Sequence, residues 1–346
     1  MPDRIYLDHA ATTPLRPEAE AAMREGFALW ANPSSPHAEG RRARAALEDA
    51  RERIKAALGW EGELIFTSGA SEALAIGLGR AKPALIGCSA VEHEAVLRHA
   101  GDATRWPVFR SGLVAMPERI EPGLVAVQQV NNETGVIQPL AEISARIRQA
   151  GGVLLADCAQ GAGKIALPDA ELIALSAHKF GGPVGIGALL VRDFGVLKPS
   201  GGQERGYRGG TENLPAVLAM LAALRAEDDW LAEANRLRRR LETALKAAGG
   251  EVVAEDVLRV ATIGAYRMPG VSSASQLIRF DAAGLAISAG SACSSGSLKV
   301  SHVLEAMAYP HPREVIRVSI GRETCDADID AFVDAWRLIA AAAKAA

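Results

Sequence analysis

Cysteine is scarce in this sequence, and its spacing forms no pairs. Four cysteines occur among 346 residues, at positions 88, 158, 293 and 325, without a C-x-x-C motif. This pattern predicts neither a zinc site nor a disulfide framework. Cys88 and Cys158 fall in or beside apolar segments typical of buried strands, so we expect them to fill space. Cys293 lies in a run of Gly, Ser and Ala with little to pack against, which predicts an exposed and reactive thiol.

The sequence also lacks long hydrophobic runs and an excess of charge. No uninterrupted apolar stretch is long enough to span a bilayer, and residues 1–8 carry charges where a signal peptide needs apolar side chains. The 38 basic and 41 acidic side chains give a net charge of −3, which disfavours nucleic acid or an anionic membrane as a partner. We therefore expect a cytoplasmic protein that binds neither.

The residues that are present indicate a folded α/β enzyme. Apolar residues make up 49% of the chain and 34 residues are glycine, as in ordinary globular proteins. Apolar segments alternate with helical ones between residues 63 and 192, which predicts a mostly parallel sheet flanked by helices. Beyond residue 251 the pattern favours a smaller α+β unit. We expect residues 15–230 to form the large domain, and residues 1–14 with 231–346 to form the small one.

One segment brings a lysine to the end of a predicted strand. The apolar residues 172–175 lead into Ser176, His178 and Lys179, and a Gly/Pro loop follows. A lysine this close to a core is costly unless it is paired or its pKa falls. An amine with a lowered pKa is a nucleophile, used most often in a Schiff base with a carbonyl such as that of pyridoxal phosphate (PLP). By itself the segment is equally compatible with a Schiff-base lysine and with a surface lysine whose ammonium group reaches the solvent.

A carboxylate is predicted at the end of another strand. Residues 153–157 are apolar until Asp157, and Gln160 follows three residues later. Open α/β sheets bind ligands at the carboxyl ends of their strands. Asp157 is therefore a candidate to pair with the nitrogen of a pyridine ring and keep it protonated. A structural aspartate or a metal ligand is the alternative, although no second carboxylate lies near it in sequence.

Three further strand ends carry polar residues. Residues 63–72 are typical of a strand, a glycine turn and a helix start, which can bind an anion through free backbone N–H groups. A helix capped by Ser71 is the alternative. His93 follows a second strand and could be structural or catalytic. Residues 131–135 place two amides and a carboxylate at the end of a third strand, where they could orient a ligand.

Three further segments are predicted to lack regular secondary structure. Residues 6–14 form a short polar arm that ends in proline, and residues 32–37 form a turn-rich loop. Both could be plain connectors, or they could place polar side chains against a ligand. Residues 201–213 are rich in glycine and charge, and they are predicted to be too polar for the core.

Nine segments of the sequence resemble those of cysteine desulfurases, which are PLP enzymes of the class V aminotransferase group. They lie in the same order over nearly the whole chain, so together they are far more specific than any single motif. The segments are residues 6–14, 66–72, 92–93, 131–135, 157–160, 176–179, 208–211, 290–293 and 316–322. The resemblance implies the α/β architecture of fold-type I PLP-dependent transferases, and a homodimer with active sites near the subunit interface.

The resemblance also implies a reaction. L-Cysteine would become L-alanine, and its sulfur would pass as a persulfide on Cys293 to an acceptor protein for iron–sulfur cluster or thio-cofactor synthesis. Lys179 would hold PLP as a Schiff base, and Asp157 would bind the pyridine nitrogen. His93 would stack on the ring and assist proton transfer. No metal is expected.

Further residues would bind the cofactor and the substrate. Gln160 and Asn132 would contact the ring hydroxyl or the substrate, and Arg317 would bind the substrate carboxylate, a task that its fixed fork of donors suits. The residues implied to hold the phosphate are Gly69, Ala70, Ser71, Ser176, His178 and Thr211 of the partner subunit.

Departures from the family pattern leave the sulfur acceptor open. Leu74 and Ala75 stand where many relatives carry polar residues, and Gly181 and Val184 stand where an aromatic residue and a lysine are common. The sequence also stops soon after its last helix, without the tail that relatives use to dock a cluster scaffold. The alternatives are a selenocysteine lyase or an aminotransferase of the same group and, less favoured, a non-catalytic binding protein. The cysteine within residues 290–293 disfavours a transaminase.

Overall fold

The computed structural model describes residues 4–226, 229–290 and 300–344 and is built around a seven-stranded sheet. The strand order is β2-β8-β7-β6-β5-β3-β4. The strands are β2 (Glu63–Thr67), β3 (Leu85–Ser89), β4 (Thr104–Trp106), β5 (Leu124–Gln128), β6 (Val153–Asp157), β7 (Leu172–Ser176) and β8 (Gly187–Val191). The mostly parallel sheet predicted from the sequence is confirmed. Only β8 runs against its neighbours, β7 and β2, because the short β7–β8 connection can only reverse the chain.

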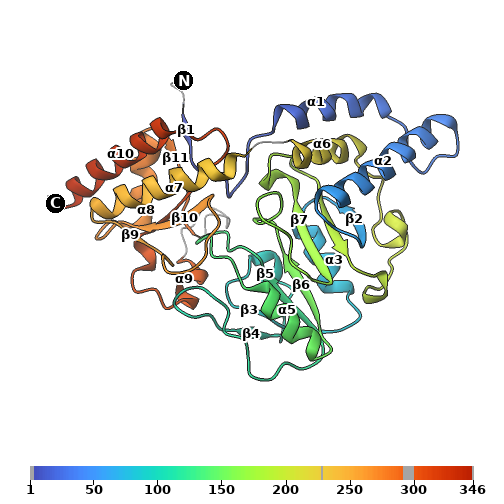
Figure 1. Ribbon diagram of the computed structural model, residues 1–346, viewed down its shortest axis with the longest axis horizontal. Coiled ribbons are helices and arrows are strands. Elements are labelled where there is room, and N and C mark those ends of the chain that lie inside the picture. Colours follow the sequence, from blue (N-terminus) through green and yellow to red (C-terminus); the bar gives the residue numbers. More distant parts are fainter. Residues whose placement is uncertain (1–3, 227–228, 291–299, 345–346) are drawn as a thin grey trace.

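Helices cover both faces of this sheet (Figure 1). The first face packs against α2 (Ala38–Ala57), α5 (Leu140–Gln149) and α6 (Leu214–Arg225), and the second against α3 (Ala70–Arg80) and α4 (Glu94–Leu97). Successive strand residues serve opposite faces: Val125 and Val127 belong to the first core, whereas Leu124 and Ala126 belong to the second. Strands buried on both faces explain the nearly continuous apolar runs. Helix α1 (Pro17–Gly26) packs on α6.

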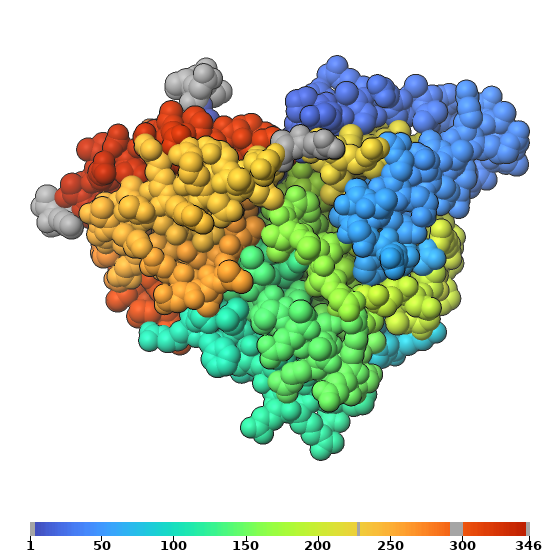
Figure 2. Space-filling view, viewed as in Figure 1, coloured from blue at the N-terminus to red at the C-terminus, as the bar shows by residue number. Residues whose placement is uncertain are grey.

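A second group of elements lies beside the large sheet (Figures 1 and 2). Its strands form a three-stranded antiparallel sheet and a two-stranded parallel one. The elements are β1 (Ile5–Tyr6), α7 (Trp230–Ala247), β9 (Glu251–Val252), β10 (Ile263–Arg267), α8 (Ser273–Ala282), β11 (Leu285–Ala286), α9 (His302–Ala306), β12 (Val315–Ser319) and α10 (Asp326–Lys344). Its core includes the stacked rings of Phe280 and Phe332, whose centroids lie 4.7 Å apart. The division of the chain into domains at residue 230 stays a prediction.

The polar loops differ from one another in burial. The loop of residues 201–213 lies mostly outside the core, as predicted, but the prediction missed that Glu204 and Glu212 are buried, at 3% and 6% exposure. Glu204 can be buried because Arg51, itself buried, supplies a counter-charge to it. His37, in the loop before α2, accepts a hydrogen bond from the backbone N–H of Gly40 and caps that helix.

Among the described residues, no helix is both long and apolar enough to cross a membrane.

Candidate active site

A cavity of about 410 Å³ lies at the carboxyl ends of β5, β6 and β7. It gathers predicted site residues from segments far apart in the sequence. Those lining it are Gly69, Ala70, Ser71, His93, Asn132, Asp157, Gln160, Ser176, His178, Lys179 and Arg317. Thr211 is exposed and is not among its lining residues. The predicted thiol, Cys293, lies outside the described residues.

Lys179 stands on a single 3-10 turn, Ala177–Lys179, that follows β7 directly. The buried strand therefore carries the side chain to the cavity floor. Its Nζ donates to the carbonyl oxygens of Ala10 and Ala11 at 2.7 and 2.8 Å. Because both acceptors are neutral, these contacts orient the amine without adding a counter-charge. The alternative of a surface lysine is wrong, since the amine is bound inside the site.

Asp157 ends β6 and is buried, with 7% of its surface exposed. Burial raises the pKa of Asp157, while the backbone N–H of Ala159, His93 and Lys179 oppose that shift. A cationic ring nitrogen placed in the cavity would favour the ionised carboxylate further. Near it, the Nδ1 atom of His93 accepts a hydrogen bond from the Ala95 N–H at 3.1 Å. The neutral imidazole therefore carries its proton on Nε2, and burial lowers the pKa of His93.

The start of α3 forms an anion-binding turn. Its N-cap is Gly69, with φ +152°, and this glycine has no side chain with which to cap the first-turn N–H groups. The alternative of a helix capped by Ser71 is therefore wrong. A Cβ on Gly69 would lie 3.3 Å from the Ser176 hydroxyl oxygen, so that hydroxyl borders the same turn. Free N–H groups, the helix dipole and a hydroxyl together suit a phosphate.

His178 stands beside this turn in the cavity wall. Burial, helped by Lys179 and Lys164, lowers the pKa of His178 to about 4. Its Nδ1 atom lies 3.2 Å from the Thr12 hydroxyl. The imidazole is thus neutral near pH 7 and available for hydrogen bonding rather than as a fixed charge.

Arg317 comes from β12 and is 3% exposed. Its Nη1 donates to the Asn132 carbonyl oxygen at 3.0 Å, and its Nη2 donates to Oδ1 of Asp8 at 2.8 Å. Its buried Nε–H finds no hydrogen-bond partner within the described ranges. Gln160 donates through Nε2 to Ala10, and its buried Oε1 likewise lacks a partner there. Polar atoms left unpaired in a cavity wall favour a polar ligand.

Several site features were missed by sequence reasoning. The arm of residues 6–14 supplies the Ala10 and Ala11 carbonyls to Lys179 and the Asp8 carboxylate to Arg317, so it is no plain connector. The arm belongs to one of the family-like segments, but backbone acceptors have no side-chain signature. Glu72 also lines the cavity and accepts from the backbone N–H of Ser68.

The amine, buried carboxylate, neutral imidazole and anion-binding turn fit PLP, so the fold and the site define a PLP-dependent transferase of fold type I. The chain matches the aminotransferase class-V family over residues 5–332. It is 35% identical to an IscS-like cysteine desulfurase of Mycobacterium tuberculosis, covering 95% of this chain and 94% of that protein. The chain therefore belongs to the class V aminotransferase family, whose members use PLP.

Two solved structures share this fold and part of the sequence. A NifS-like protein from Rickettsia africae has a TM-score of 0.87 at 28% identity, covering 97% of this chain and 99% of its own. SspA, whose structure was solved in complex with cysteine, has a TM-score of 0.79 at 28% identity, covering 93% of this chain and 100% of its own.

Proposed function

We propose that this protein is a cysteine desulfurase, which converts L-cysteine to L-alanine and transfers the sulfur through Cys293 to an acceptor protein. The observation that carries the proposal is the convergence of Lys179, Asp157, His93 and Arg317 on one cavity. The similarity to an IscS-like cysteine desulfurase along nearly the whole chain supports the choice of reaction.

The cofactor would be held at both of its ends. Lys179 would bind it covalently through Nζ, Asp157 would face its ring nitrogen, and Gln160 would contact the ring hydroxyl. The turn of residues 69–71, with Ser176 and His178, would bind the phosphate. Bound PLP supplies an electron sink that draws electrons from the substrate and weakens its Cβ–S bond.

The protein's own groups would bind L-cysteine and move its protons. Arg317 would bind the substrate carboxylate through the Nε–H that lacks a described partner, and Asn132 would help orient it. When Lys179 is not bonded to the cofactor, its Nζ would take up and return protons of the substrate carbons. The His93 Nε2 atom would exchange a proton with the substrate, because Nδ1 is engaged with the Ala95 N–H.

The sulfur transfer would use Cys293 as nucleophile. Its thiolate would attack the substrate sulfur, forming an S–S bond while the Cβ–S bond breaks. The electron pair of the broken bond would stay with the substrate carbon, which gains a proton to become the alanine methyl group. The products are alanine and a persulfide on Cys293, so no external oxidant or reductant is needed.

The proposal includes a homodimer in the cytoplasm. Thr211 is exposed and is not part of its own chain's cavity lining, which supports its use at the phosphate site of a second copy. A sulfur acceptor protein would receive the persulfide from Cys293. Iron–sulfur cluster or thio-cofactor synthesis is the use that this product implies.

Incubation of the PLP-loaded protein with L-cysteine tests the proposal. Alanine and total sulfide plus persulfide should appear in equal amounts when a thiol reductant is present. Cys293→Ala should abolish sulfur release while leaving PLP absorbance intact. Alanine formation by Cys293→Ala at the original rate would refute Cys293 as the nucleophile. Amino-group transfer to a keto acid without sulfide would instead identify an aminotransferase.

A further inference from the structure

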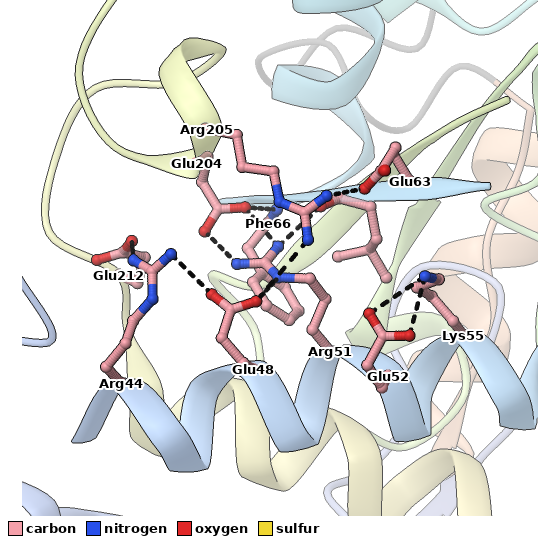
Figure 3. A network of polar contacts seen from close by, with 11 residues as sticks. Arg44, Glu48, Arg51, Glu52, Lys55, Glu63, Phe66, Glu204, Arg205 and Glu212 are labelled. Carbon is pink, nitrogen blue, oxygen red and sulfur yellow. Dashed lines mark hydrogen bonds and ion pairs between the residues drawn. The ribbon is translucent and has the colours of Figure 1, made fainter. Parts of the chain in front are cut away.

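One of the two edges of the seven-stranded sheet, formed by β2, is covered by two side chains. Strand β2 ends the strand order, and its inner side pairs with β8. On the outer side, the Glu204 Oε2 atom accepts from the Phe66 N–H at 2.8 Å, and the Arg51 Nη1 atom donates to the Leu64 carbonyl oxygen at 2.7 Å. These two side chains thus occupy the place of a further strand (Figure 3).

The same two side chains form a bidentate ion pair. The Nη1 and Nη2 atoms of Arg51 lie 2.8 and 3.0 Å from the two carboxylate oxygens of Glu204. The Nε atom of Arg51 donates to Glu48 at 3.0 Å, and its guanidinium lies 4.6 Å from the ring centroid of Phe66. Arg51 is 1% exposed. An ion pair this buried, with its donors and acceptors satisfied, fixes Glu204 in one position.

Glu204 in turn fixes a loop with an unfavourable backbone. Glu204 and Arg205 have φ values of +46° and +56°, a region that side chains with a Cβ rarely adopt unless their surroundings enforce it. A second anchor lies further along, where the Nε atom of Arg208 donates to Glu72 at 2.9 Å. Glu72 belongs to the first turn of α3, at the cavity. Between these anchors and α6, Thr211 is held exposed.

We propose that the Arg51–Glu204 pair is a positioning device for the active site of a second copy of this chain. By fixing the loop on the sheet edge, the pair holds residues 209–211 in place, so that the Thr211 hydroxyl reaches the PLP phosphate bound by the partner subunit. This inference rests on the proposed function, because it requires a PLP-binding homodimer. Arg51 and Glu204 do not touch the reacting atoms; they act through Thr211.

Hybrid dimers with two different affinity tags test the direction of this effect. One subunit carries Lys179→Ala, so only the other subunit can form the Schiff base, whose absorbance reports PLP binding. Glu204→Gln is placed on either subunit, because glutamine keeps an acceptor for the Phe66 N–H but removes the charge. Arg205→Ala is the matched control, since it removes the partly exposed contacts of the same loop with Glu63 and Glu48 and leaves the Arg51–Glu204 pair in place.

Glu204→Gln on the Lys179→Ala subunit should raise the PLP dissociation constant of the other subunit about 10-fold, the effect of losing one hydrogen bond to a charged phosphate. On the subunit that keeps Lys179, it should leave the constant unchanged, as Arg205→Ala should in either place. Equal weakening in both placements, or no weakening in either, would overturn the inference.

A double variant tests the same inference if Glu204→Gln alone does not fold. Arg51→Met combined with Glu204→Gln leaves no unpaired buried charge and should show the same dependence on placement. Thermal unfolding and sedimentation first establish that each hybrid is folded and dimeric. A hybrid that carries only Lys179→Ala, binds PLP and forms no alanine from L-cysteine would contradict the proposed function. The positioning effect would still be measured from PLP affinity.

Discussion

Substitutions in the ion pair between Asp8 and Arg317 can separate the loss of a counter-charge from the loss of an orienting hydrogen bond. Asp8 both neutralises the buried guanidinium and orients it, through a contact of 2.8 Å. Asp8→Asn keeps an oxygen acceptor but removes the charge, whereas Asp8→Ala removes both. Comparison of the two variants therefore shows whether the arm of residues 6–14 supplies charge, orientation or both to the substrate site.

The magnitudes follow from burial. Removing one partner of a fully buried ion pair costs about 3–5 kcal/mol. The Asp8 side chain is 21% exposed, so solvent compensates part of this, and we expect Asp8→Asn to lower the free energy of unfolding by roughly 2–3 kcal/mol. A substrate carboxylate would then be the main counter-charge of Arg317, so KM for L-cysteine should be unchanged or lower. Asp8→Ala should raise KM about tenfold, because the guanidinium loses an orienting hydrogen bond.

Urea unfolding of the PLP-free protein and steady-state alanine formation measure the two effects. L-Alanine, which carries the same carboxylate, should stabilise Asp8→Asn more than it stabilises the unsubstituted protein. If Asp8→Asn raises KM as much as Asp8→Ala does, or if neither variant changes stability, the reasoning from the ion pair is refuted.

Three further substitutions test other parts of the structure. Gly187→Ala should weaken PLP binding in a spectroscopic titration, because its Cβ would lie 2.4 Å from the Leu175 carbonyl oxygen and 2.7 Å from the Gly69 Cα. Burial raises the pKa of Glu92 to about 8, from 4.5 in the unfolded chain. Between these two pH values the native state binds more protons than the unfolded state, so the free energy of unfolding falls as pH rises. Glu92→Gln should reduce this pH dependence of the free energy of unfolding, measured by urea titration. Ser301→Ala should lower the free energy of unfolding by about 1–2 kcal/mol, because it removes the cap of α9 and a hydrogen bond to Glu133.

Each of these has a matched comparison. Gly79→Ala has no neighbour within 4 Å of the added Cβ, so it should leave PLP affinity unchanged; equal losses in both glycine variants would contradict the steric argument. A slope between pH 5 and 8 that survives in Glu92→Gln would assign it to another group. Ser301→Thr should restore the cap of α9, and a threonine variant as unstable as the alanine one would rule out capping as the cause.

The residues at the strand ends that line the cavity were predictable because their signal is local. Lys179 and Asp157 each follow an apolar run that fills a buried strand, and the ends of such strands meet at one edge of the sheet. The resemblance to a known family then placed Arg317 and His93 at the same site. In the structure these residues line one cavity.

The remaining features depend on contacts that no short segment encodes. Arg51 and Glu204 lie 153 residues apart, and Asp8 and Arg317 lie 309 residues apart. The direction of β8 follows from how its connection turns back, not from its own alternation of side chains. The burial of Glu204 was missed because its loop, rich in glycine and charge, gives no sign that Arg51 of α2 pairs with it.

The arm of residues 6–14 has a practical consequence for work with this protein. It leaves β1, which pairs with β11, and then places two carbonyl oxygens against Lys179. A fusion that pulls on the amino end would therefore act on the Lys179 amine through only a few residues of chain. Tags and surface attachments are better placed after α10, whose helix lies on the outside of the molecule and away from β7 (Figure 1).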